Sequence, residues 1–258
     1  MTTEDRLLSL AAGVCPETGP AEFVSACASA GWPACGIWYD AATWTDAVAG
    51  EVRLRLDDTG LIALDMEPIF VTPDGDHGDA VIEAAATVGA RNLLVVSRGV
   101  DDDQFVDRFG ELCDLAAAHG IGCSLEFMAF MSIRDLSQAT AALDAVDRPN
   151  ASVLIDNLHL ARTGGTVADV AAVDPARLPY VQLCDAPASA PDQLVVEALD
   201  GRLLLGAGEL PVGELVDVLP AHTALSFEMR SAQLRSTYPD PTERARHVLS
   251  TTRAFLQR

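Results

Sequence analysis

The feature that most constrains the fold of this chain is a regular alternation between short apolar runs and longer amphipathic stretches. Apolar runs typical of buried strands occur at residues 7–14, 35–39, 61–70, 92–97, 121–127, 153–156, 180–185 and 224–229. Helix-like stretches separate or follow them, at residues 20–30, 45–58, 79–88, 102–119, 135–146, 167–173, 211–219 and 241–256. This alternation predicts a parallel sheet with right-handed crossovers. Eight units in 258 residues predict one α/β domain over residues 1–258, a (β/α)8 TIM barrel.

Side chains with oxygen ligands stand at or near the ends of four consecutive apolar runs: Glu126, Asp156, Gln182 and Glu228. In a (β/α)8 barrel the carboxyl ends of the strands form the active site, so these side chains are expected to meet there. A buried carboxylate must be paired or bound to a metal, because burying it alone costs too much free energy. An Asp after a strand also suits a helix N-cap, and for Asp156 both interpretations stay open.

The composition excludes several classes of function. The formal charge is −21, from 38 acidic residues against 17 basic ones, and every basic residue is Arg. The absence of Lys excludes Schiff-base aldol chemistry, lysine-anchored pyridoxal phosphate and a Walker A phosphate loop. An acidic chain with no basic stripe also argues against a nucleic-acid or anionic-membrane partner.

The cysteines and the first residues bear on the compartment. Six Cys residues occur without a CxxC pair, mostly in apolar patterns, which indicates reduced thiols rather than a disulfide framework. The first residues, MTTEDRLLSLAAG, do not have the basic start and long apolar core of a signal peptide. No run approaches the roughly 20 apolar residues of a membrane span. A cytoplasmic location is therefore expected.

Five segments resemble the xylose isomerase-like TIM-barrel superfamily, often described as sugar phosphate isomerases and epimerases: SLEF, LIDNLHLARTGG, YVQLCDAP, RLLLGAGELP and LSFEM. The resemblance covers essentially the whole chain. It implies an enzyme with one divalent metal ion held by strands five to eight, here by Glu126, Asp156, Gln182 and Glu228. Many members have His at the strand-seven position. Gln occurs there in metal-dependent 3-dehydroshikimate dehydratases, which the chain also resembles.

The residue types at these positions define a chemistry. Carboxylate and amide oxygens suit Mn²⁺, Mg²⁺ or Co²⁺ better than a thiolate-loving metal. Such an ion can chelate a carbonyl and a neighbouring hydroxyl and stabilise an enolate. Glu126 and Glu228, on strands separated by two others, could exchange the α-proton from opposite faces of the substrate. His159 is a candidate proton shuttle or hydrogen-bond donor.

Four further residues are candidates for substrate binding. Arg202 could hold a carboxylate or polarise a hydroxyl. Glu67, near the end of its run, could contact a hydroxyl or support a ligand. Asp185 could fix the Gln182 amide or touch the substrate, and Trp38 could form a wall of the pocket.

Arg98 and Arg230 also follow apolar runs, but ion pairing is their expected role.

Several functions remain open on the sequence alone. The first is a metal-dependent isomerase or epimerase acting on a small polyhydroxy ketone. The second is a lyase of the dehydratase type, and the third is a non-catalytic sugar-binding barrel. A DNA-repair endonuclease of the superfamily is disfavoured, because the chain has neither the histidines for a zinc cluster nor a basic surface. Related barrels often pair, so a homodimer is a further expectation.

Overall fold

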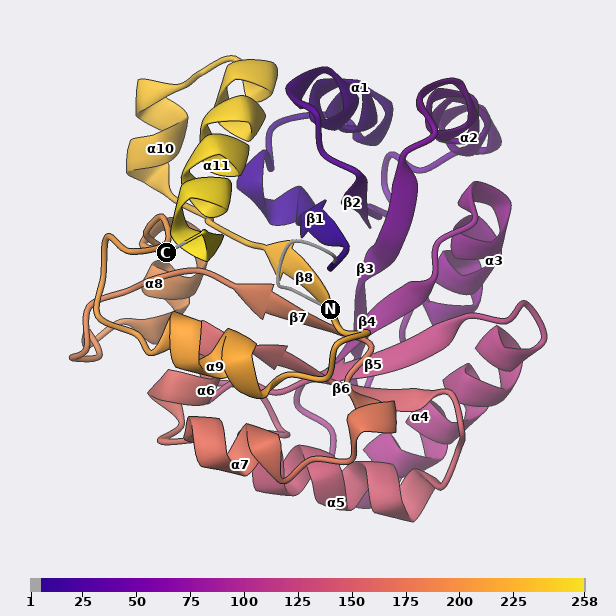
Figure 1. The fold of residues 1–258 in the computed structure, drawn as a ribbon. Helices are drawn as coiled ribbons and strands as arrows, with labels where there is room; N and C mark the ends of the chain where they lie inside the picture. Colours follow the sequence, from indigo (N-terminus) through magenta and orange to yellow (C-terminus); the bar gives the residue numbers. More distant parts are fainter. Residues whose placement is uncertain (1–5, 258) are drawn as a thin grey trace.

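A computed structural model describes residues 6–257 as a closed barrel of parallel strands surrounded by helices (Figure 1). The strands follow one another around the barrel in chain order, and β8 pairs with β1. Their bounds are β1 Leu8–Leu10, β2 Ala34–Trp38, β3 Ile62–Val71, β4 Asn92–Ser97, β5 Gly122–Glu126, β6 Ala151–Asp156, β7 Tyr180–Leu183 and β8 Ala224–Phe227. The predicted fold, a single (β/α)8 TIM barrel, is confirmed.

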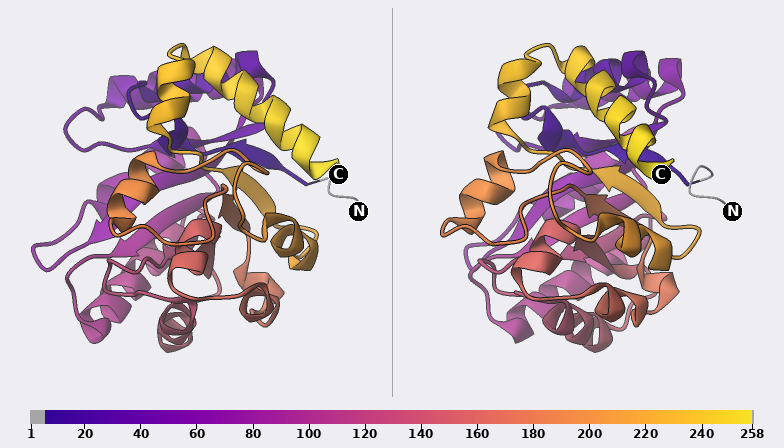
Figure 2. Two further views of the ribbon diagram at one scale, coloured as in Figure 1. Left: turned by 90° about the vertical axis from the view of Figure 1, so that its left-hand side faces the viewer. Right: turned by 60° about the vertical axis from the view of Figure 1, so that its left-hand side comes forward.

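Helices form the outer layer of the barrel, as the two side views show (Figure 2). Their bounds are α1 Pro20–Ala30, α2 Asp46–Thr59, α3 Gly78–Val88, α4 Asp102–Ala117, α5 Leu136–Val146, α6 Asn157–Arg162, α7 Val167–Ala171, α8 Leu194–Asp200, α9 Val212–Val218, α10 Ala232–Thr237 and α11 Pro241–Leu256. Residues 6–257 also contain the 3-10 helices η2 Ala12–Val14 and η3 Pro175–Arg177. Side chains cap several N-termini, such as Asp101 before α4 and Asp135 before α5.

The first strand is shorter than the sequence predicts. The apolar run over residues 7–14 forms β1 only as far as Leu10, and its second half is the 3-10 turn η2. In that turn the N–H of Val14 donates to the carbonyl of Ala11, and the N–H of Cys15 donates to that of Ala12. Apolar character alone does not separate a strand from a buried turn, because both place side chains in the core.

Three short helices that the sequence analysis did not predict follow the last three strands: α6, α8 and α10. They have six, seven and six residues, which is less than two helical turns. Asp156 starts α6, since its Oδ1 accepts from the N–H groups of Leu158 and His159, at 2.8 and 3.1 Å. The N-cap interpretation of Asp156 is therefore correct for one of its two oxygens.

The inside of the barrel changes from apolar to polar toward the carboxyl ends of the strands. A cluster of buried apolar side chains from six strands packs together: Ala34, Leu64, Leu94, Val96, Leu154, Tyr180 and Ala224. Beside it, Asp65 of β3 pairs in register with Gly36 of β2. A Cβ added at Gly36 would lie 3.1 Å from Asp65 Oδ1, so the glycine leaves room for the carboxylate.

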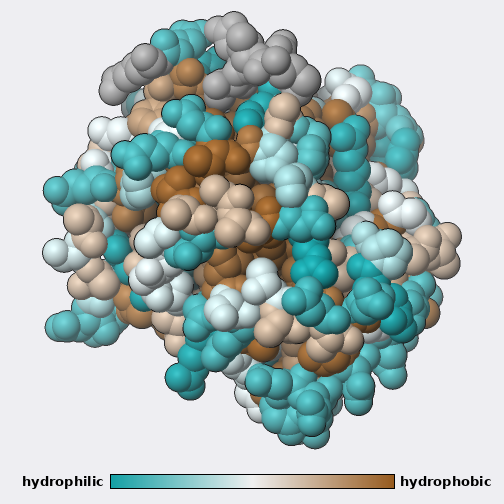
Figure 3. Space-filling model, turned by 60° about the horizontal axis from the view of Figure 1, so that its bottom comes forward, coloured by the Kyte–Doolittle hydropathy of each residue, from teal (hydrophilic) through white to brown (hydrophobic). Residues whose placement is uncertain are grey.

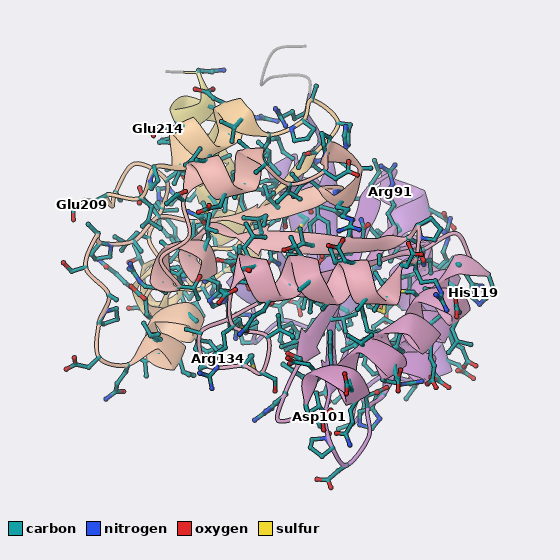
Figure 4. The ribbon with its side chains drawn as sticks, turned by 90° about the horizontal axis from the view of Figure 1, so that it is seen from below. Arg91, Asp101, His119, Arg134, Glu209 and Glu214 are labelled. Atoms are coloured by element: carbon teal, nitrogen blue, oxygen red, sulfur yellow. The ribbon has the colours of Figure 1, made fainter. Side chains whose placement is uncertain are left out.

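The outer surface is mainly hydrophilic in the view of Figure 3, with hydrophobic side chains gathered in a central hollow. Figure 4 shows the direction of the barrel axis: Asp101 and Arg134, in the loops after β4 and β5, lie toward one end. Arg91, directly before β4, lies nearer the other end. None of the helices within residues 6–257 is long and apolar enough to cross a membrane.

The ion pair between Asp76, in the β3–α3 loop, and Arg108 of α4 provides a test of the fold. Asp76 accepts from the Gly78 N–H at the start of α3 and from Nε and Nη2 of Arg108 in α4, at 2.7, 2.9 and 2.8 Å. Its side chain is only 4% exposed. The hydrogen bonds from Arg108 hold the pKa of Asp76 below its ordinary value of 3.8.

We expect Asp76→Asn to lower the free energy of unfolding by about 1–3 kcal/mol at neutral pH, because the partly buried N–H groups of Gly78 and Arg108 lose a charged acceptor. A carboxyl with a depressed folded-state pKa stabilises the fold above its unfolded pKa and loses that effect as the pH falls. Urea unfolding should therefore show the difference between the two proteins shrinking below about pH 4. Asp79→Asn is the control, since Asp79 contacts the same Arg108 but is 70% exposed. Equal losses in both variants would contradict this account.

Candidate active site

A cavity of about 390 Å³ opens where the strands end, and most of the predicted site residues line it. These residues are Trp38, Glu67, Glu126, His159, Gln182, Arg202 and Glu228. Asp156 is completely buried and contacts the cavity residue Arg202. Carboxyl ends of parallel strands meet at one mouth of the barrel, which is why Glu67 and Gln182, 115 positions apart in sequence, are neighbours here.

Arg202 joins two of the predicted metal ligands. Its Nη1 lies 2.6 Å from Asp156 Oδ2, and its Nη2 lies 2.8 Å from Glu228 Oε2. The Arg202 side chain is 2% exposed, and its Nε donates to the carbonyl of Ala198 in α8. The planar guanidinium can serve both carboxylates at once because its N–H groups point in fixed directions. Arg202 therefore places a positive charge directly beside Asp156 and Glu228.

Asp156 is held as an anion. Burial by itself would raise its pKa, but the charge and hydrogen bond of Arg202, together with His159, lower the pKa below its ordinary value. Both oxygens already accept hydrogen bonds, Oδ1 from the start of α6 and Oδ2 from Arg202. A carboxylate oxygen has two lone pairs, so Asp156 keeps the capacity to bind a cation as well.

His159 lies against the carboxylates. Its Nε2 is 3.9 Å from Glu126 Oε1, and possible ligand atoms of Glu126, Asp156 and His159 all lie within 4.8 Å of one another. Burial lowers the pKa of His159 to about 4, so the ring is neutral near pH 7. Phe130 meets the ring edge-on, with the ring centroids 5.7 Å apart. A neutral, oriented imidazole can donate an N–H to a substrate oxygen or bind a metal.

Glu67 orients the Gln182 amide. Nε2 of Gln182 donates to Oε2 of Glu67 at 3.3 Å, and Gln182 is 1% exposed. The amide oxygen of Gln182 is buried and has no hydrogen-bond partner among residues 6–257. An orphaned buried acceptor costs free energy unless a donor or a cation meets it. Because the Gln182 N–H group donates to Glu67, the Gln182 oxygen is the atom left to meet a ligand.

Three other acids of the site hold protons more strongly than usual. Burial raises the pKa of Glu228 to about 8, although Arg202 acts in the opposite direction. Burial and the charge of Asp65 raise the pKa of Glu67 to about 8. Burial also raises the pKa of Glu126 well above its ordinary range, and the charges of Asp156 and Glu228 add to the effect. Such carboxyls can exchange protons near neutral pH.

The residues present fit a divalent metal ion. The donor set consists of carboxylate oxygens, one amide oxygen and one imidazole nitrogen, which suits a hard or borderline cation. The orphaned Gln182 Oε1 and the close group of Glu126, Asp156 and His159 point to the same need for positive charge. Of the four predicted ligands, Glu126 and Asp156 belong to this close group, and Glu228 contacts Arg202 at a different nitrogen from Asp156.

Asp185 has a different role from the one suggested by the sequence. Its Oδ1 accepts from the N–H groups of Ala186 and Leu210, and its Oδ2 accepts from that of Gly206. Within residues 6–257 it makes no hydrogen bond to Gln182, whose amide donates to Glu67 instead. Asp185 therefore fixes the loop over residues 203–210 and does not line the cavity.

Asp65 is the acid that the sequence analysis missed. It is fully buried in the barrel, neither of its oxygens has a hydrogen-bond partner within residues 6–257, and burial raises its pKa to about 7. The signal was present in the run LIALDMEPIF, where Asp65 precedes Glu67 by two residues. Two acids at that spacing point to the same face of a strand.

Gly13 touches the site from η2 and gives a test of its packing. A Cβ at this position would lie 2.7 Å from Glu228 Oε1 and 2.8 Å from Arg230 Cδ. Gly13→Ala should displace both side chains, at a cost of about 1–3 kcal/mol, and weaken Mn²⁺ binding about tenfold by calorimetry. Gly50→Ala is the control, because nothing lies within 4 Å of its added Cβ in α2. Unchanged Mn²⁺ affinity in Gly13→Ala would contradict the placement of Glu228.

The fold and the acidic mouth define a (β/α)8 barrel with a candidate metal site. Residues 24–255 match the family described as xylose isomerase-like TIM barrel, and the chain belongs to that family. A search of curated proteins finds no match.

Solved structures share the fold at low sequence identity. The IOLI protein, crystallised with a binding zinc atom, is 14% identical with a TM-score of 0.82, and the alignment covers 96% of this chain and 97% of that one. The probable 3-DHS dehydratase AsbF of Bacillus anthracis is 15% identical with a TM-score of 0.74, covering 94% and 98%. D-psicose 3-epimerase of Clostridium cellulolyticum H10, solved with D-tagatose, is 13% identical with a TM-score of 0.71, covering 96% and 99%.

The chain also aligns with part of a xylose isomerase-like TIM barrel/4-hydroxyphenylpyruvate dioxygenase fusion protein, of which it spans 42%.

Proposed function

We propose that this protein is a divalent-metal-dependent isomerase or epimerase that moves a proton at the carbon next to the carbonyl of a polyhydroxy ketone. The observation that carries the proposal is a pair of buried carboxyls, Glu126 and Glu228, that line one cavity and have raised pKa values. Exchange of a carbon-bound proton needs a base and an acid of this strength within reach of the same substrate atom.

Glu126, Asp156, Gln182 and Glu228 would hold the metal ion, with His159 beside them. When bound, Mn²⁺, Mg²⁺ or Co²⁺ supplies Lewis-acid stabilisation to a substrate carbonyl and its enolate. A zinc atom in the similar IOLI structure supports a divalent site in this fold.

Each of the other steps is assigned to a side chain of the site. Glu126 and Glu228 take and return the proton, with one acting as base while the other acts as acid. His159, neutral at pH 7, donates its N–H to a substrate oxygen. Arg202 keeps Asp156 ionised, and Glu67 keeps the Gln182 oxygen facing the site. The apolar side chains that line the cavity, among them Phe70, Leu94 and Val96, limit the access of water to the enolate.

A second candidate is a dehydratase, in which proton removal is followed by loss of a β-hydroxyl as water. One observation favours it: the ligand position on β7 is Gln182, which also occurs in metal-dependent 3-dehydroshikimate dehydratases. The fold shared with the probable dehydratase AsbF is consistent with this alternative.

The experiment is a substrate panel in D₂O with metal-stripped and Mn²⁺-loaded protein. An isomerase or epimerase gives a ketose that gains deuterium at the carbon next to the carbonyl, only when Mn²⁺ is present. A product lighter by one water, with a new enone absorbance from a cyclic ketone, would favour the dehydratase. Equal activity of metal-stripped protein would contradict both candidates.

A further inference from the structure

The charged side chains that line the cavity are not all acidic. Three glutamates, Glu67, Glu126 and Glu228, share the lining with three arginines, Arg98, Arg202 and Arg230. In a chain with a net charge of −21 and 17 arginines, three guanidiniums on one small cavity are a local concentration of positive charge. Arg202 is accounted for by its two carboxylates, and the other two are not.

Among residues 6–257, Arg98 and Arg230 have no ion-pair partner. Within residues 6–257 neither guanidinium lies within 4.0 Å of a carboxylate oxygen, and the Nε of Arg230 is buried with no hydrogen bond. The ion pairs expected from the sequence for Arg98 and Arg230 are therefore not formed within the described residues. Each guanidinium lies against an aromatic ring instead: Arg98 is 5.5 Å from the centroid of Phe70, and Arg230 is 5.6 Å from that of Trp38.

The aromatic contacts hold the guanidiniums without using their N–H groups. A cation over a ring face is stabilised by the ring quadrupole, while the N–H groups at the edge of the guanidinium plane stay free to donate. Phe70 and Trp38 both line the cavity, together with Pro68 of the same strand, β3. The exposed Arg98 and the half-buried Arg230 can thus both donate hydrogen bonds to a ligand in the cavity.

We infer that the substrate of this site carries a carboxylate on its carbon frame, and that Arg98 and Arg230 select for it. The inference rests on the proposed function and narrows its substrate class from neutral ketoses to keto acids with several hydroxyls. The ketone and hydroxyls face the acids, the carbon frame lies on the apolar side chains that line the cavity, and the carboxylate accepts from the two guanidiniums.

The test compares two ligands that differ only in charge. D-tagatose is titrated against the corresponding keto acid, which has a carboxylate in place of the terminal CH₂OH, with Mn²⁺-loaded protein in a calorimeter. A second pair, shikimate and its methyl ester, makes the same comparison on a cyclic frame. A charge-assisted pair predicts that at least one acid binds about tenfold or more tightly than its neutral partner at millimolar concentration or below.

Two single variants test whether Arg98 and Arg230 cause the preference for the acid over its neutral partner. Arg98→Gln and Arg230→Gln should each lower the acid preference about tenfold and leave Mn²⁺ affinity unchanged. Arg134→Gln is the matched control, because Arg134 is exposed on the loop after β5 and does not line the cavity (Figure 4). It should keep the full preference.

Equal binding of acid and neutral partner, no binding of either acid, or a preference that survives in both variants would overturn the inference. Those results would leave the proposed function intact, provided that Mn²⁺ still supports proton exchange on a neutral ketose. Loss of Mn²⁺ binding in the unmodified protein would overturn the proposed function instead.

Discussion

Glu228→Gln is expected to abolish proton exchange while the protein remains folded. The substitution keeps the shape of the side chain and its contact with Arg202, but it removes both a negative charge and a proton-carrying group. General acid–base groups contribute about 10²–10⁴ in rate, so turnover in the Mn²⁺-loaded variant should fall by at least that factor. Mn²⁺ affinity measured by calorimetry should fall as well, because one anionic ligand is lost.

Glu214→Gln is the matched control, since Glu214 is an exposed residue of α9 that does not line the cavity (Figure 4). It should keep full turnover and the same Mn²⁺ affinity. Turnover in Glu228→Gln within a few-fold of the unmodified protein would remove Glu228 from the mechanism.

Arg202→Met should cause the largest loss of stability among single substitutions at the site. The Met side chain approximates the volume of the Arg stem, but Asp156 and Glu228 lose their shared guanidinium while both stay buried. Removal of one partner of a buried ion pair costs about 3–5 kcal/mol, and we expect a loss of this size in urea unfolding without metal. Saturating Mn²⁺ should restore part of it, because the cation replaces the missing positive charge.

Arg177→Met serves as the control for this experiment. Arg177 pairs with Asp144, which is 70% exposed, and such surface pairs contribute about 0–1 kcal/mol. A loss below about 1 kcal/mol in Arg202→Met would mean that Arg202 does not compensate the buried acids.

The barrel and the place of its mouth could be predicted from the sequence because they depend on local patterns. Apolar runs of strand length, each followed by a helical stretch, predict the topology, and residues at the ends of the runs must then meet at one rim. Glu126 and Glu228 could be identified in this way without any knowledge of their neighbours. The same reasoning extends to Glu67 and Trp38, which stand near the ends of β3 and β2.

The pairing of charges could not be predicted, because it depends on tertiary distances. Nothing in the segment RLLLGAGELP indicates that Arg202 reaches both Asp156 and Glu228. Likewise, Asp185 follows β7 as closely as a site residue should, yet backbone N–H groups of its own loop take up its oxygens. A side chain one or two positions past a strand can point into the cavity or away from it, and the path of the loop determines which.

The short helix α6 determines how Asp156 and His159 are placed in the site. Because α6 begins directly at Asp156, the same side chain ends a strand, caps a helix and faces Arg202. The helix also brings His159 back toward Glu126, so that the histidine is buried against the acids. Spacing alone placed His159 near the site, and the helix accounts for its neutral, desolvated ring.

The central claim, a divalent metal site built from the ends of β5 to β8, is tested most directly by anomalous diffraction from crystals grown with Mn²⁺. We predict one anomalous peak at the barrel mouth, about 2.0–2.6 Å from carboxylate oxygens of Glu126, Asp156 and Glu228 and from Oε1 of Gln182. No peak at the mouth with Mn²⁺ at saturating concentration, or a peak that contacts none of these four side chains, would contradict the account.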